Sequence, residues 1–166
     1  YFGAFLGISL GFALFGKTDF IQPEALPKWT AWLAILLLCS SLIIIFRTKL
    51  KHASWSIASG FIAYAASISA AVYFDYSIGA FVGAFAVGVF SNLFNRVVNA
   101  PASIVAMQGL IVLVPGSKTY IGLNSLIEGQ SFVNADQIGQ QTFLIFMSLV
   151  AGLIFANVAL PPKKSL

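Results

Sequence analysis

The chain has 166 residues, of which 59% are hydrophobic and only 8% charged, and its mean hydropathy is +0.93. So few polar residues cannot cover the surface of a soluble globule, which excludes that class. The net charge of +4 comes from basic residues spread over loop ends, not from a cluster of the kind that binds nucleic acid. We therefore expect an all-α integral membrane protein, because long continuous apolar runs suit helices better than barrel strands.

Six apolar runs follow one another, each near the roughly 20 residues that cross about 30 Å of hydrocarbon. The first, "YFGAFLGISLGFALFG" (1–16), begins on Tyr1 without a methionine or a basic leader. It is typical of the end of a longer chain and not of a signal peptide. The other five predicted spans are 29–46, 55–74, 76–94, an interrupted segment around Pro115, and 142–160.

Basic and acidic residues separate onto alternate loops, and this separation predicts the orientation. Arg47, Lys49 and Lys51 follow the second span, Arg96 ends the fourth, and Lys163 and Lys164 lie in the tail. Every acidic residue falls in the intervening loops: Asp19, Glu24, Asp75, Glu128 and Asp136. Short cytoplasmic loops carry the positive excess. Both ends of this segment are therefore predicted in the cytoplasm, and the loops 17–28, around Asp75 and 128–138 outside.

Glycine stripes predict how the spans pack, because lipid provides no hydrophobic drive between helices and close backbone approach must supply contact. Plain helix packing is a better interpretation of them than ligand binding. The glycines that we expect to face protein are Gly3, Gly7, Gly11, Gly79, Gly83, Gly88 and Gly152.

Polar residues at membrane depth gather in the fifth segment, around "VLVPGSKTY" (112–120). Pro115 removes a backbone donor and Gly116 permits non-helical geometry, so the carbonyls of residues 111–114 would be free to hold a cation or an ammonium group. A new helix beginning near Ser117 would present amides to a carboxylate. Broken helices of this kind form substrate sites in secondary transporters, although a simple proline kink explains the pattern about as well.

Lys118 admits two interpretations. If the segment is one kinked span from Ala102 to Ile127, about 39 Å long at helical rise, Pro115 lies near the midplane and Lys118 can anchor a substrate carboxylate. If the spanning part ends near Val114, Lys118 snorkels to the outer interface.

The chain offers little else for chemistry. His52, the only histidine, is expected to be a solvated residue of a basic loop, and Cys39, the only cysteine, lies in an apolar span. No pairing of acids, of His with a carboxylate, or of Ser with His occurs at membrane depth. We therefore predict no enzyme activity, no cofactor and no metal site.

Two segments carry a family resemblance: "GAFAVGVFSNLFNRVVNAPASIVAMQGLIVLVPGSKTYIGL" and, at the end, "LVAGLIFANVALPPKKSL". Over about residues 30–166 the chain resembles the C-terminal membrane half of the threonine/serine exporter family. The resemblance implies a ten-helix secondary transporter of two five-helix halves, fused or separate, which uses the proton gradient to export small amino acids or, in some members, a dicarboxylate. Residues 1–16 would be the last helix of the first half, 17–28 an extracytoplasmic loop and 29–166 the second half. Lys118 and Ile121 depart from the family pattern.

Three functions stay open at this stage: a secondary exporter in the bacterial inner membrane, a channel, and a structural membrane subunit. A channel would need a continuous file of polar residues, whereas the chain shows a cluster. An exporter would work with the missing half, a small substrate and protons, and an oligomer of identical chains stays open. Its predicted substrate site consists of Gln108, Pro115, Gly116, Ser117, Lys118, Thr119, Tyr120 and Asn124, joined by Ser91 and Asn92 from the fourth span.

Overall fold

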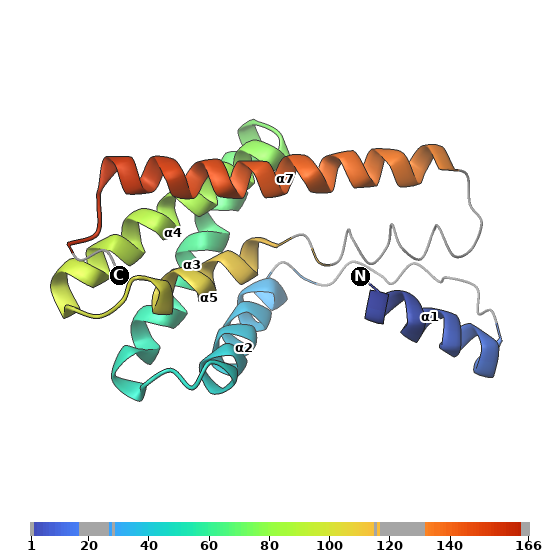
Figure 1. Ribbon diagram of the computed structural model, residues 1–166, viewed down its shortest axis with the longest axis horizontal. Coiled ribbons are helices and arrows are strands. Elements are labelled where there is room, and N and C mark those ends of the chain that lie inside the picture. Colours follow the sequence, from blue (N-terminus) through green and yellow to red (C-terminus); the bar gives the residue numbers. More distant parts are fainter. Residues whose placement is uncertain (1, 17–26, 28, 115, 117–131, 164–166) are drawn as a thin grey trace. The chain divides into compact units, whose positions relative to one another are not determined.

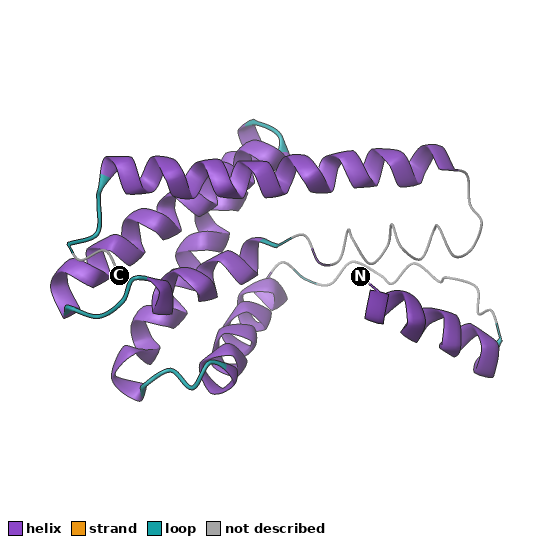
Figure 2. Ribbon diagram, in the orientation of Figure 1, coloured by secondary structure: helices purple, strands orange, loops and turns teal. Residues whose placement is uncertain are grey.

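The computed structural model describes residues 2–16, 27, 29–114, 116 and 132–163. Every regular element among these residues is an α-helix (Figures 1 and 2). The helices are α1 (Phe2–Phe15), α2 (Trp29–Ile45), α3 (Leu50–Tyr73), α4 (Tyr76–Val98), α5 (Ser103–Leu113) and α7 (Phe132–Ala159). The expectation of an all-helical chain is therefore confirmed for the described residues.

Three segments are long and apolar enough to cross a membrane by length and composition: Leu50–Tyr73, Tyr76–Val98 and Gly139–Ala159. They correspond to the third, fourth and sixth predicted spans. Helix α2 has 17 residues and α5 has 11, lengths of about 26 Å and 16 Å at 1.5 Å per residue. These are shorter than the hydrocarbon layer, so length by itself does not establish six spans.

Two compact units divide the chain, one of residues 1–26 and 115–143 and the other of residues 27–114 and 144–166. Helix α1 belongs to the first unit, where a Cβ added at Gly7 or Gly11 would meet nothing within 4 Å. The second unit is built around α3, which contacts α2, α4 and α5. Residues 144–159 of α7 pack against α4 in the same unit, where Ile145 and Leu149 form a buried cluster with Ala80 and Ala84.

Small residues bring the helix backbones of the second unit close together. A Cβ added at Gly79 would lie 2.8 Å from the carbonyl oxygen of Ser67, and one at Gly83 would lie 3.1 Å from that of Ala63. Gly88 faces the methyl group of Ala156 on α7. The glycines of α4 therefore lie at its contacts with α3 and α7, as close packing in lipid requires.

Three short connections join the helices. Helix α2 ends in a Schellman motif, in which Thr48 N donates to Ile43 O and Arg47 N to Ile44 O, with Arg47 in the left-handed region at φ 48° where glycine is usual. Phe74 and Asp75 are extended and separate α3 from α4, at the break that the sequence predicts. Asn99 ends α4 at φ 54°, and Pro101 precedes α5.

A prediction about packing concerns Gly152 in α7. Its added Cβ would lie 2.5 Å from the carbonyl oxygen of Phe81 and 3.0 Å from the amide nitrogen of Phe85, which are backbone atoms that cannot move aside cheaply. We expect Gly152→Ala to lower the free energy of unfolding by about 1–3 kcal/mol, measured as a lower apparent melting temperature in detergent. Gly139→Ala, in the same helix but with nothing within 4 Å, is the control and should not destabilise. Equal melting temperatures would contradict the close α4–α7 contact.

Candidate functional site

One face of α3 carries three buried polar side chains. His52, Ser56 and Ser59 follow each other at intervals of four and three residues, which places them in one row on the helix surface. Ser56 and Ser59 are fully buried and His52 is 5% exposed. This row lies on the side of α3 that packs inside the second unit.

Gln108 of α5 is also fully buried. Its Nε2 atom donates a long hydrogen bond of 3.5 Å to the hydroxyl of Thr48, in the connection between α2 and α3. The next residue, Gly109, brings α5 against both neighbouring helices: a Cβ added there would lie 2.5 Å from Ser59 Oγ and 2.7 Å from Val87 Cγ2. Of the polar row, Ser59 therefore lies where α5 packs on α3, at the residue that follows Gln108.

Four buried polar atoms in this region have no hydrogen-bond partner among the described residues: His52 Nδ1, Ser56 Oγ, Ser59 Oγ and Gln108 Oε1. Other helical serines form a hydrogen bond within their own helix: the hydroxyls of Ser40, Ser69 and Ser91 donate to carbonyls three or four residues earlier. A buried polar group without a partner costs about 1–3 kcal/mol. We call Ser56, Ser59, His52 and Gln108 the polar cluster; its unused atoms are available to a ligand.

His52 corrects an expectation from the sequence. It does not lie in a solvated loop, because α3 begins at Leu50, and its ring packs edge-on against Phe94 with 5.3 Å between the ring centroids. Helical periodicity explains the difference: Lys51 is exposed and His52 is buried one position further along the same turn.

Helix α5 ends at Leu113, and Val114 is extended at φ −64° and ψ 128°. This agrees with the expected interruption, because a residue before proline is driven out of the helical region. Gly116 is exposed, with nothing within 4 Å of an added Cβ. The other predicted site residues of this segment lie outside the described residues: Pro115, Ser117, Lys118, Thr119, Tyr120 and Asn124. Gly3 is described only as part of the α1 backbone.

Ser91 and Asn92 have structural partners. The hydroxyl of Ser91 donates to Gly88 O. The amide of Asn92 donates to Asn157 Oδ1 and to Leu160 O, both at 2.8 Å, so both of its hydrogens are in use. Beside it, Arg96 donates twice to Pro161 O, at 3.2 and 2.8 Å. This end of α4 holds the end of α7 and the tail.

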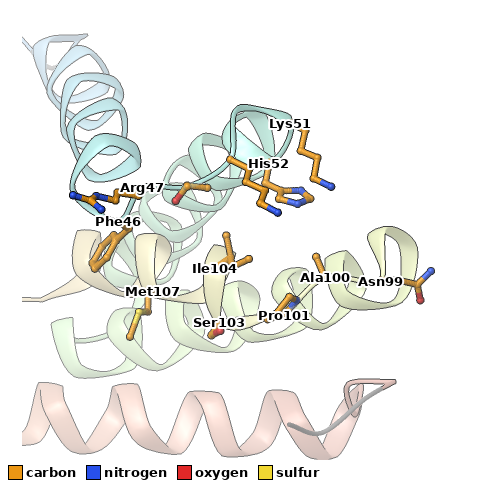
Figure 3. A pocket seen from close by; sticks show the side chains of 12 residues that line it. Phe46, Arg47, Lys51, His52, Asn99, Ala100, Pro101, Ser103, Ile104 and Met107 are labelled. Carbon is orange, nitrogen blue, oxygen red and sulfur yellow. The ribbon is translucent and has the colours of Figure 1, made fainter.

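A pocket of about 470 Å³ opens at one end of the second unit (Figure 3). Residues 46–52 and 99–107 supply its twelve lining residues, among them Arg47, Lys49 and Lys51 but no acid. His52 and Thr48 also line it. The pocket and the polar cluster therefore share His52 and, through Thr48, the hydrogen bond of Gln108. Within the described ranges, no three His, Cys, Asp or Glu side chains form a group that could hold a metal ion.

Apolar helices long enough to cross a bilayer, packed through small residues, define an integral membrane protein. A family model described as "Threonine/Serine exporter, ThrE" matches residues 30–159. The chain belongs to the threonine/serine exporter family, as the resemblance in its sequence predicts. Comparisons with curated proteins and with solved structures gave no match.

The sequence singled out Gln108, which the structure buries, but did not predict the burial of Ser56, Ser59 and His52. The signal that could have found the α3 residues is the spacing of small polar residues at intervals of four and three. Their burial still depends on which face of α3 meets α5, and only the structure supplies this.

We predict opposite stability effects for the two kinds of buried polar residue. Ser56→Ala and Ser59→Ala remove hydroxyls without partners, so the free energy of unfolding should stay the same or rise. Asn92→Ala removes two satisfied hydrogen bonds and should lower it by about 1–3 kcal/mol, with apparent melting temperatures in detergent as the measurement. Destabilisation by both serine variants to the extent of Asn92→Ala would show that their hydroxyls are structural.

Proposed function

We propose that this protein is a secondary exporter of small amino acids such as threonine and serine, and that the polar cluster forms part of its substrate path. Membership of the exporter family supports export of this substrate class. The observation that carries the location of the path is the set of buried polar atoms without partners on α3 and α5. Polar groups at membrane depth that a protein leaves unpaired mark a substrate route.

The chemistry of the cluster suits a hydroxylated amino acid. The free Oε1 of Gln108 can accept a hydrogen bond from an ammonium or hydroxyl group, and the serine hydroxyls can donate to a carboxylate or accept from a hydroxyl. A substrate loses hydrogen bonds to water when it enters the membrane, and the polar cluster could replace them. The hydrogen bonds within the protein must be weak enough for a substrate to displace, as is the 3.5 Å bond between Gln108 and Thr48.

A dicarboxylate exporter is the second candidate, because the pocket that adjoins the cluster is lined by three cations and no acid. A purely structural subunit, the third interpretation, has no use for buried polar atoms without partners.

Coupling to protons and pairing with a second membrane half also belong to the proposal, and both are supported only by what the family resemblance implies. The three candidate spans Leu50–Tyr73, Tyr76–Val98 and Gly139–Ala159 contain no aspartate or glutamate, and His52 is their one histidine.

The test of the substrate path is Gln108→Leu, which replaces the amide with an apolar group of similar size. We expect counterflow of labelled threonine into vesicles that hold the complete transporter to fall by about tenfold or more, the equivalent of about 1.4 kcal/mol, while the protein still inserts and folds. Gln141→Leu, at an exposed position of α7, is the matched control. Counterflow of succinate under the same conditions distinguishes the two substrate classes.

Undiminished counterflow of both substrates by Gln108→Leu would remove the polar cluster from the substrate path. The same substitution should also leave the apparent melting temperature unchanged or higher, because Gln108 Oε1 has no partner to lose, the bond from Nε2 to Thr48 is long at 3.5 Å, and a leucine fills the same space. Loss of transport together with a preserved fold is therefore the combination that the proposal requires.

We further propose that the basic end of the second unit faces the cytoplasm of a bacterial cell. Lys51 and Asp75 lie just inside the start and just beyond the end of α3, so they report on opposite sides. In a Cys39→Ser background we expect Asp75→Cys to react with a membrane-impermeant thiol reagent added to whole cells, and Lys51→Cys to react only after the membrane is permeabilised. The reverse labelling would invert the proposed orientation.

A further inference from the structure

The pocket of about 470 Å³ at the basic end has two walls with different chemistry (Figure 3). One wall is the connection between α2 and α3, and the other runs from the end of α4 into α5. Arg47, Lys49 and Lys51 supply cationic groups on the first wall, and all three residues are exposed. None of them has an ion-pair partner among the described residues, and no acid lines the pocket. Its charge is therefore free for an anion.

The backbone fixes one of these cations in an unusual way. Arg47 occupies the left-handed position of the Schellman motif at φ 48°, where a side chain is strained and glycine is common. The same turn directs the hydroxyl of Thr48 towards Gln108. Asn99, on the opposite wall, has a similar backbone at φ 54° and no charge, and Figure 3 shows its side chain directed away from the pocket.

The interior of the pocket contains a polar group that is itself buried. His52 lines the pocket although it is only 5% exposed, and its Nδ1 atom has no hydrogen-bond partner among the described residues. Behind it, on the same face of α3, follow Ser56 and Ser59. The pocket thus shares His52 with the polar cluster, and Thr48, which also lines the pocket, accepts the hydrogen bond of Gln108.

We propose that this pocket is the loading site of the exporter, where Lys49 and Lys51, with Arg47 at the far edge of the same wall (Figure 3), attract the carboxylate of a small acid before it displaces Thr48 from Gln108. This inference rests on the proposed function. A lipid phosphate is the other anion that a basic pocket at a membrane interface attracts. The link to the polar cluster through buried His52 favours a small soluble acid, because a headgroup held by its acyl chains has no use for a polar route inward.

The experiment measures protection from thiol modification in the complete transporter. In a Cys39→Ser background, Ser103→Cys places a thiol at an exposed position that lines the pocket. Threonine or succinate at about ten times its Kd should slow modification of this thiol about tenfold, since about one site in eleven stays empty. Leu50→Cys is the control, because Leu50 is 87% exposed between Lys49 and Lys51 but does not line the pocket.

Two variants with matched backbones test the charge. Arg47→Gly removes the cation and suits φ 48°, so it should retain the turn and abolish the protection. Asn99→Gly makes the corresponding backbone change without removing a charge, so the Ser103→Cys thiol should still be protected. Protection that survives Arg47→Gly, equal protection of Leu50→Cys, or protection by potassium chloride at equal ionic strength would each overturn the proposal.

The lipid alternative is tested in the same assay, with vesicles of phosphatidylcholine alone or mixed with phosphatidylglycerol. If phosphatidylglycerol slows modification of the Ser103→Cys thiol and neither acid does, the pocket is a lipid site and the proposal is wrong. Protection does not require turnover. A failed loading site is therefore distinguishable from a failed substrate path, which Gln108→Leu reports through counterflow.

Discussion

Close approach of helix backbones is the constraint on which the larger unit depends. Lipid tails are as apolar as leucine, so helices associate only where small residues let their surfaces meet closely. Gly109 of α5 meets Ser59 of α3 and Val87 of α4, and Gly60 meets Cys39 of α2. These contacts also enclose polar atoms, since Ser59 lies at the Gly109 contact and both Ser59 and Gln108 are fully buried.

Buried polar groups divide into two sets with different partners. At the end of α4, Asn92 and Arg96 donate to Asn157, Leu160 and Pro161, and this set holds the helix ends together. On α3 and α5, four buried atoms have no hydrogen-bond partner in the part of the chain that the structure describes. A fold under selection for stability alone loses such atoms readily, because replacing them with apolar groups is nearly neutral or favourable. Their presence is the observation on which the proposed substrate path rests.

Composition and hydropathy predict the membrane class, the helices and the break before Pro115, because each depends on local physics. The role of Asn92 could not be predicted, because its partners are 65 and 68 positions away. The fall in hydropathy near Lys51 predicts a loop at His52. The helix nevertheless continues through this charged turn, so that Lys51 is exposed on one side of α3 and His52 is buried on the other. Ser56 and Ser59 resemble ordinary helical serines in sequence. Only the structure reveals that their hydroxyls do not bond to their own helix.

The hydrogen bonds of the tail have a consequence for movement. Five bonds join the end of α4 to residues 157–163, so α4 and the adjoining end of α7 resist separation. By contrast, one hydrogen bond of 3.5 Å joins Gln108 of α5 to the turn after α2. The end of α4 and the end of α7 are therefore tied together by side-chain hydrogen bonds, whereas α5 is held to α3 and α4 mainly by the close contacts of Gly109.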